Sequence, residues 1–151
     1  NYRSCVSMLL NKNKITSFSS NKKTKIKLYT TSISAGFPSP AEDHMDVSLD
    51  INEYLVKHPS STFYIYVKGD SMINSGIFDG DLMIVDRSLE VKSNSIVVAV
   101  INGEFTVKKI KKDSGNIYLI PDNKNYKPIL LENSMDFQIW GIVTHTIHHF
   151  L

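Results

Sequence analysis

The stretch SIVVAVINGEFTVKKI, residues 95–110, decides how this chain folds. Two runs rich in β-branched and aromatic residues flank Asn102-Gly103, and Asn-Gly between such runs is the strongest short-range indication of a two-residue β-hairpin. Counting outward from that turn places Val97 opposite Lys108 on the neighbouring strand. The stretch therefore predicts both a β fold and the register of its hairpin.

Side-chain alternation separates Lys108 from its neighbour Lys109. Successive side chains of a strand point to opposite faces, so Lys108 shares a face with Thr106 and Ile110, whereas Lys109 points the other way. Apolar surroundings lower the pKa of a lysine amine because they disfavour its charged form. We expect Lys108 to be desolvated and Lys109 to be an ordinary solvated lysine whose removal changes little.

Outward from the hairpin, the pattern predicts a mostly β fold with one or two short helices. Hydrophobic residues make up 42% of the 151 residues, enough to form the core of about one domain. A short helix is expected over residues 46–58, where Asp50 could act as a cap and Pro59 ends the helix. Further strands are expected at residues 62–67, 82–85, 117–120, 129–131 and 137–147, the last interrupted at Gly141.

Positive charge is concentrated at the N-terminus. Residues 1–35 hold seven Lys and Arg and no acidic residue, whereas the remainder holds ten basic and fifteen acidic residues. Residues 1–28 are rich in Asn, Lys and Ser, so we expect little stable structure there and no sequence-specific DNA binding. Pro38 and Pro40 exclude a helix and predict an extended segment over residues 34–43.

Several classes of protein are excluded by composition. The single cysteine, Cys5, cannot form an intramolecular disulfide or a cysteine-cluster metal site, and a reducing cytoplasm is the default compartment. No apolar run approaches the ~20 residues that span a bilayer, so no membrane association is expected. None of the five histidines, His44, His58, His145, His148 and His149, lies in a catalytic-triad motif. Without a cysteine or carboxylate pattern beside them they do not predict a metal site, and we expect no metal and no cofactor.

Ser71 follows Gly69-Asp70 directly after an expected strand, where a side chain can project from a sharp turn. By itself such a serine is typical of an ordinary turn. A serine hydroxyl becomes an effective nucleophile only with a base in hydrogen-bond reach, and a neutral lysine can provide one. The segment over residues 34–43, if extended, has the form that a protease groove accepts as an added strand.

Short blocks of this sequence resemble, in order, the LexA/UmuD family of self-cleaving serine peptidases. The blocks are GFPSPA at 36–41, GDSMI at 69–73, DGDLMIVD at 79–86, GEFTVKK at 103–109 and WGIV at 140–143. The resemblance covers residues 36–145 and implies that Ser71 is the nucleophile and Lys108 the general base. It also implies an oxyanion hole formed by backbone N–H groups of Asp70 and Ser71.

The resemblance implies how the chain is divided and what it works with. Cleavage between Ala35 and Gly36 would remove an arm of residues 1–35 and leave a linker with a short helix, 36–61, ahead of a peptidase domain, 62–151. In this family the RecA filament on single-stranded DNA stimulates cleavage. The trimmed homodimer then acts with the polymerase subunit UmuC in error-prone translesion synthesis during the SOS response.

Three alternatives remain open. A LexA-like or phage-type self-cleaving transcriptional repressor needs a helix-turn-helix ahead of the cleavage site, and the 35 residues before Gly36 lack two capped apolar helices. A relative of signal peptidase would use the same serine–lysine chemistry but needs a membrane anchor. A non-enzymatic β scaffold would bind a polymerase partner without cutting any bond.

Overall fold

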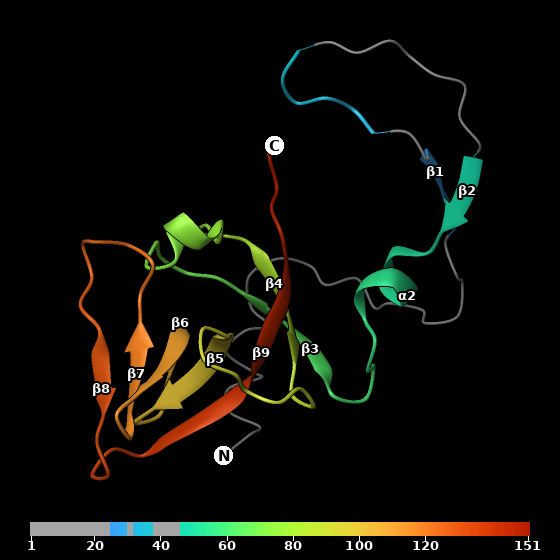
Figure 1. The fold of residues 1–151 in the computed structure, drawn as a ribbon. Coiled ribbons are helices and arrows are strands. Elements are labelled where there is room, and N and C mark those ends of the chain that lie inside the picture. The colour runs from blue at the N-terminus through green and yellow to red at the C-terminus, as the bar shows by residue number, and fades with distance from the viewer. Residues whose placement is uncertain (1–24, 30–31, 38–45) are drawn as a thin grey trace. The chain divides into compact units, whose positions relative to one another are not determined.

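The computed structural model describes residues 25–29, 32–37 and 46–151, in two units, Asn1–Ile51 and Asn52–Leu151. In the first unit, β1 (Ile26–Tyr29) pairs antiparallel with β2 (Asp46–Leu49). The short helix α2 (Ile51–Leu55) starts at the last residue of the first unit and continues into the second (Figure 1). Among the helices described, none has the length and apolar character needed to cross a bilayer.

The helix predicted over residues 46–58 is wrong at both ends, and residues 56–58 are not helical. Asp46–Leu49 form β2, and the helix is limited to Ile51–Leu55. The expectation of little stable structure over residues 1–28 is also wrong at residues 26–28, which belong to β1, while residues 1–24 lie outside the described part. Pairing between β1 and β2 explains why residues 26–28 and 46–49 form strands. Each segment receives backbone hydrogen bonds from a distant partner that its own sequence pattern does not indicate.

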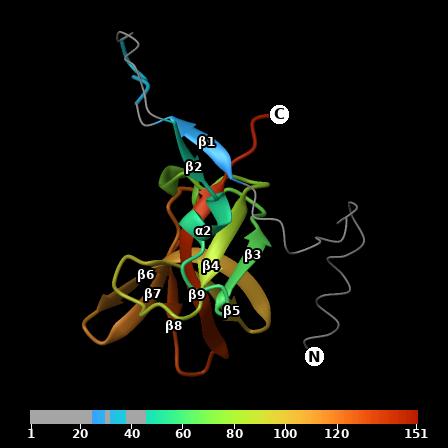
Figure 2. The same ribbon diagram turned by 90° about the vertical axis from the view of Figure 1, so that its right-hand side faces the viewer.

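The second unit contains the strands β3 (Thr62–Tyr66), β4 (Leu82–Asp86), β5 (Ile96–Ile101), β6 (Glu104–Asp113), β7 (Asn116–Ile120), β8 (Ile129–Leu131) and β9 (Phe137–Ile147). They form one antiparallel sheet in the order β3-β4-β9-β5-β6-β7-β8, and the predicted mostly β fold is confirmed. Figures 1 and 2 show the long β9 running from β5 to β4. A 3₁₀ turn, η1 (Ile73–Ser75), follows Ser71.

The hairpin of β5 and β6 has the predicted register, with Val97 opposite Lys108. Asn102 has a φ of 48° and Gly103 a φ of 85°, the positive values that a two-residue type I′ turn requires. On its other side β6 pairs with β7 only from Lys109 onward. The half of β6 that ends at Lys108 therefore has a strand neighbour on one side only, which leaves room for another segment to approach.

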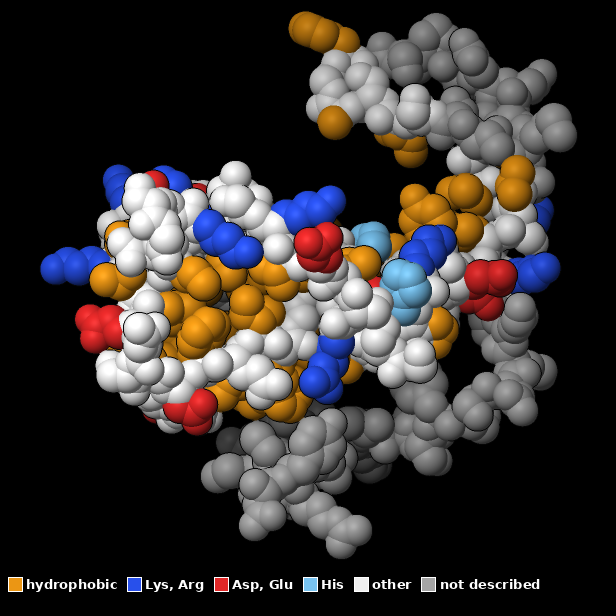
Figure 3. Space-filling view, turned by 60° about the horizontal axis from the view of Figure 1, so that its bottom comes forward, with side chains coloured by type: hydrophobic (Ala, Val, Ile, Leu, Met, Phe, Trp, Pro, Cys, Tyr) orange, Lys and Arg blue, Asp and Glu red, His pale blue; other side chains and the backbone are white. Residues whose placement is uncertain are grey.

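Two hydrophobic clusters occupy opposite faces of the sheet. The first contains Val67, Met72, Ile77, Met83, Val85 and Val98, and the second contains Val97, Ala99, Ile110 and Leu119. Met72 is 1% exposed, so it anchors the segment after Ser71 in the first cluster. Hydrophobic side chains also reach the surface on one face of this unit, with charged side chains around them (Figure 3).

Gly141 lies within β9, which continues through it although the sequence predicted an interruption. A Cβ at this position would lie 2.8 Å from Val85 Cγ1 and 2.9 Å from the carbonyl oxygen of Asp86. Because the backbone of β4 cannot retreat without disturbing its own pairing, we expect Gly141→Ala to lower the free energy of unfolding by about 2–3 kcal/mol. Urea unfolding measures this value.

The matched control for Gly141→Ala is Gln138→Ala, an exposed position of the same strand. Its unfolding free energy should stay within ~0.5 kcal/mol of the parent. Equal midpoints for the two variants would mean that β4 and β9 separate at no cost, contrary to this expectation.

Candidate active site

The structure brings Ser71 and Lys108 together. Lys108 Nζ lies 2.9 Å from Ser71 Oγ, although the two residues are 37 positions apart in the chain. The same amine lies 2.7 Å from Thr106 Oγ1 and 2.9 Å from the carbonyl oxygen of Val107. Thr106 is the neighbour on the same strand face that side-chain alternation predicted, and it orients the amine.

Burial determines the electrostatics of Lys108. Lys108 is only 8% exposed, and desolvation lowers the pKa of its amine from the ordinary value of 10.5. Among the described residues, no carboxylate forms an ion pair that would restore the charged form. A neutral amine at this distance can accept the proton of the Ser71 hydroxyl, which is the arrangement of a nucleophile and its base.

Residues 69–75 form the segment that carries Ser71; one hydrogen bond holds its start, and another closes a turn within it. Gly69 N donates to Asp79 Oδ1 at 2.5 Å, and Ile73 N donates to the carbonyl oxygen of Asp70 at 3.2 Å. The backbone N–H groups of Asp70 and Ser71 donate to no acceptor among the described residues. Both donors are therefore available to an oxyanion that develops beside Ser71.

A second loop, residues 121–126 after β7, binds the 69–75 segment. Asp122 N donates to the carbonyl oxygen of Ser71 at 2.8 Å. Asn123 Nδ2 donates to the carbonyl oxygen of Asp70 at 3.0 Å, and the Tyr126 hydroxyl donates to the Asp70 carboxylate. The sequence pattern did not predict a role for this loop, because nothing local in the loop indicates a partner 53 residues away.

Lys109 is not the ordinary solvated lysine that the sequence predicted. Its amine lies 2.6 Å from Asp122 Oδ2, and its side chain is 35% exposed. Ser75 Oγ donates to the same carboxylate oxygen at 2.5 Å. The hydrogen bonds from Lys109 and Ser75 lower the pKa of Asp122. Strand alternation predicted the direction of Lys109 correctly but not the distant carboxylate that it meets.

Ala35 and Gly36, the expected cleavage site, lie in the first unit. The chain bends at residues 35–37, and Gly36 N donates to Ser34 Oγ at 3.3 Å. The extended segment predicted over residues 34–43 is therefore wrong at the bend, and residues 38–43 of that range lie outside the described part. Phe37 is 92% exposed, so the bend is open to solvent.

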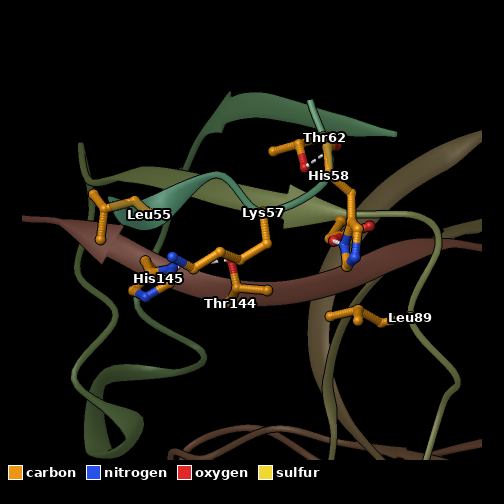
Figure 4. A pocket seen from close by; sticks show the side chains of 8 residues that line it. Leu55, Lys57, His58, Thr62, Leu89, Thr144 and His145 are labelled. Carbon is orange, nitrogen blue, oxygen red and sulfur yellow. Dashed lines mark hydrogen bonds and ion pairs between the residues drawn. The ribbon is translucent and has the colours of Figure 1, made fainter. Parts of the chain in front are cut away.

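A pocket of about 100 Å³ lies elsewhere in the second unit and includes neither Ser71 nor Lys108 (Figure 4). In its wall, Asp86 Oδ2 lies 2.6 Å from His58 Nδ1. Burial opposes ionisation of Asp86, but hydrogen bonds from Ser88, His58 and Ser61 outweigh it and lower its pKa to about 2. His44 lies outside the described residues, among which no group of His, Cys, Asp and Glu could hold a metal ion.

Comparison with known proteins assigns the chain to a family. The chain matches the family model described as Peptidase S24-like over residues 27–144. The chain belongs to this family. The matched region of the S24-like peptidase contains both Ser71 and Lys108. Membership of this family supports the assignment of the chain as a self-cleaving serine peptidase.

Individual curated proteins show which relatives the S24-like peptidase resembles. It is 43% identical over 123 residues to protein MucA of Salmonella typhimurium, covering 81% of this chain and 84% of MucA. It is 41% identical over 121 residues to protein SamA of Salmonella typhimurium, covering 80% of this chain and 84% of SamA. The resemblance to the LexA/UmuD family is confirmed, because these relatives are UmuD-like members of it.

A repressor also appears among the relatives of the S24-like peptidase. The chain is 42% identical over 101 residues to the LexA repressor of Clostridium perfringens. That match covers 67% of this chain but 50% of the repressor. The similarity is therefore limited to a region that makes up half of the repressor.

Proposed function

We propose that this S24-like peptidase cleaves its own Ala35–Gly36 bond, with Ser71 as nucleophile and Lys108 as general base. The observation that carries the proposal is the 2.9 Å distance between Lys108 Nζ and Ser71 Oγ, at a lysine that is 8% exposed. Burial lowers the pKa of this amine, so the amine is neutral in a larger fraction of molecules at physiological pH. It can then take a proton that an ordinary lysine could not.

The first half of the reaction forms an acyl-enzyme. Neutral Lys108 accepts the hydroxyl proton as Ser71 Oγ attacks the carbonyl carbon of Ala35. The carbonyl oxygen becomes an oxyanion, which the N–H groups of Asp70 and Ser71 stabilise. The C–N bond then breaks, and the Lys108 ammonium gives its proton to the departing amine of Gly36. An ester between Ala35 and Ser71 remains.

The second half hydrolyses that ester. Lys108 is neutral again and accepts a proton from a water molecule, while the oxygen of that water attacks the Ala35 carbonyl carbon. The ester bond to Ser71 Oγ breaks, and the proton on Lys108 returns to the serine. The products are an arm that ends in the Ala35 carboxylate and a body that begins at Gly36.

Presentation of the bond is the step at which regulation would act. A protease groove binds an extended peptide, whereas residues 35–37 form a bend with a hydrogen bond between Gly36 and Ser34. Straightening this bend must precede attack by Ser71. A partner that stabilises the extended form accelerates cleavage, and we propose that the RecA filament on single-stranded DNA is that partner.

The proposal extends to a cellular role by analogy with the family. We propose that residues 1–35 are removed in the cytoplasm during the SOS response and that the product, comprising the linker 36–61 and the peptidase domain 62–151, forms a homodimer. The dimer would act with UmuC in error-prone translesion DNA synthesis. Similarity to the UmuD-like proteins MucA and SamA supports this role. Hydrophobic side chains on one face of the body (Figure 3) offer a surface to protein partners.

The 42% identity to a LexA repressor favours one further candidate, a self-cleaving transcriptional repressor. The two roles differ in sequence-specific DNA binding before cleavage. Selection of bound fragments from genomic DNA by the uncut chain tests this. Retention of one defined sequence supports the repressor, and no retention above that of scrambled DNA supports the polymerase-associated role.

Intact mass after incubation with activated RecA filament tests the proposed function directly. The parent chain should give two species that meet at the Ala35–Gly36 bond, and Ser71→Ala should stay whole. Cleavage at another bond would overturn the site assignment. An uncut parent, both with the filament and at alkaline pH, would favour a non-enzymatic scaffold.

A further inference from the structure

Two adjacent lysines of β6 reach the same 69–75 segment by different routes. Lys108 meets the hydroxyl of Ser71 directly. Lys109 points to the opposite face, and its amine meets the carboxylate of Asp122. Asp122 in turn contacts the main chain of Ser71, so both lysines are linked to the nucleophile. The mechanism above uses only the first of these links.

Asp122 connects to the segment through its backbone as well as its side chain. Its N–H donates to the carbonyl oxygen of Ser71 at 2.8 Å, and its carbonyl oxygen accepts from Asn74 N at 3.0 Å. Its carboxylate accepts from Ser75 Oγ at 2.5 Å and from Lys109 at 2.6 Å. Three of these contacts hold the 69–75 segment to Asp122, and the fourth ties Asp122 to the sheet.

The sheet end of this connection is rigid. Lys109 belongs to a strand that is paired on both sides at that position, with Ile96 on β5 and with Ile120 on β7. The adjacent Lys108 is fixed by the same backbone. A Ser71 segment that is tied to Lys109 through Asp122 is therefore held at a defined distance from the amine of Lys108.

We propose that Lys109 is a positioning residue for Ser71, acting through Asp122 to hold the 69–75 segment against Lys108. This inference rests on the proposed function for its consequence in catalysis. The ion pair is partly open to solvent, with side chains 35% and 29% exposed, so it adds little to global stability. Its effect falls on local opening of the 69–75 segment.

The first arm of the test measures self-cleavage rates from pH 6 to 10. Lys109→Met should cleave about tenfold more slowly at every pH, because a small displacement of a nucleophile costs that much or more. The midpoint of the pH profile should not move, since it reports Lys108. Lys109→Arg should recover most of the rate, because arginine keeps the ion pair but cannot act as a base.

Lys111→Met is the matched control, because Lys111 is an exposed lysine two residues further along the same face of β6. Its rate should equal that of the parent. All variants should show parental thermal unfolding midpoints. Equal rates for Lys109→Met and Lys111→Met, or an Arg variant as slow as the Met variant, would overturn the inference.

The second arm does not depend on catalysis. In a Ser71→Ala background, hydrogen exchange of the Asp122 and Asn74 amides should be about tenfold faster with Lys109→Met and unchanged with Lys111→Met. Unchanged exchange with Lys109→Met overturns the inference. If exchange accelerates but the parent chain never cuts itself, the proposed function fails. The inference that Lys109 positions the 69–75 segment is then still supported.

Discussion

Lys108→Ala should stop self-cleavage, with a rate about a thousandfold or more below that of the parent. The variant removes the only amine within hydrogen-bond distance of Ser71 Oγ in the described structure. Without it, the hydroxyl proton has no acceptor, and the Gly36 amine has no donor when it departs. The first-order rate of appearance of the cut body, followed by intact mass with RecA filament present, measures the loss.

Loss of activity must be separated from loss of the fold. Lys108→Met keeps the length of the aliphatic stem and serves as the second variant. A buried lysine whose pKa is lowered on folding costs stability below its folded pKa, and this cost fades as the pH rises toward 10.5, the ordinary value expected in the unfolded chain. At neutral pH, Lys108→Met should therefore unfold at the same urea concentration as the parent or a higher one.

The outcome that contradicts this prediction is a cleaving variant. If Lys108→Ala and Lys108→Met both cut at the parental rate, lysine is not the base and the serine–lysine mechanism fails. If both are inactive but also unfold in less urea than the parent, the defect lies in the fold. An inactive Lys108→Met with parental stability is the expected result.

Unaided self-cleavage should accelerate about tenfold for each unit of pH up to the folded pKa of Lys108 and then level off. The direction follows from chemistry, because only the neutral amine accepts the Ser71 proton and a rising pH increases the neutral fraction. Burial lowers the pKa of this amine from 10.5, so levelling should begin below that value. A series of rates from pH 6 to 10.5 without RecA filament shows the profile.

The control for this profile is Ser71→Ala, which reports any cleavage that hydroxide or a contaminating protease causes. Its rate should stay at background throughout the series. A parent rate that still rises tenfold per unit at pH 10.5 would indicate a solvated lysine. A rate that does not change with pH would indicate that presentation of the Ala35–Gly36 bond, not proton transfer, limits the reaction.

Local sequence was enough to predict the part of the site that one hairpin contains. Asn102-Gly103 sets a two-residue turn, and the alternation of side chains then places Lys108 beside Thr106 and opposite Val97. Desolvation of Lys108 followed from the apolar residues of that face, and its pKa is lowered as expected. These features depend on neighbours within one or two strands, which is the range over which sequence pattern is informative.

Prediction failed where a distant partner decided the local structure. Residues 46–49 were predicted to be helical but form a strand, because β1 lies beside them. Lys109 was predicted to be solvated, but the loop after β7 brings Asp122 to it. In each case the competing interaction comes from a segment that the local pattern does not contain.

The sequence by itself determined the β character of the body, the hairpin register and the residue types from which a nucleophile and a base can be made. Tertiary structure alone decided that Ser71 and Lys108 meet at 2.9 Å and that residues 121–126 hold the Ser71 segment. The physical reason is that alternation and turn chemistry act between neighbours in the chain. Contact between residues 37 or 53 positions apart depends instead on how the strands and loops pack on the two hydrophobic clusters of the sheet.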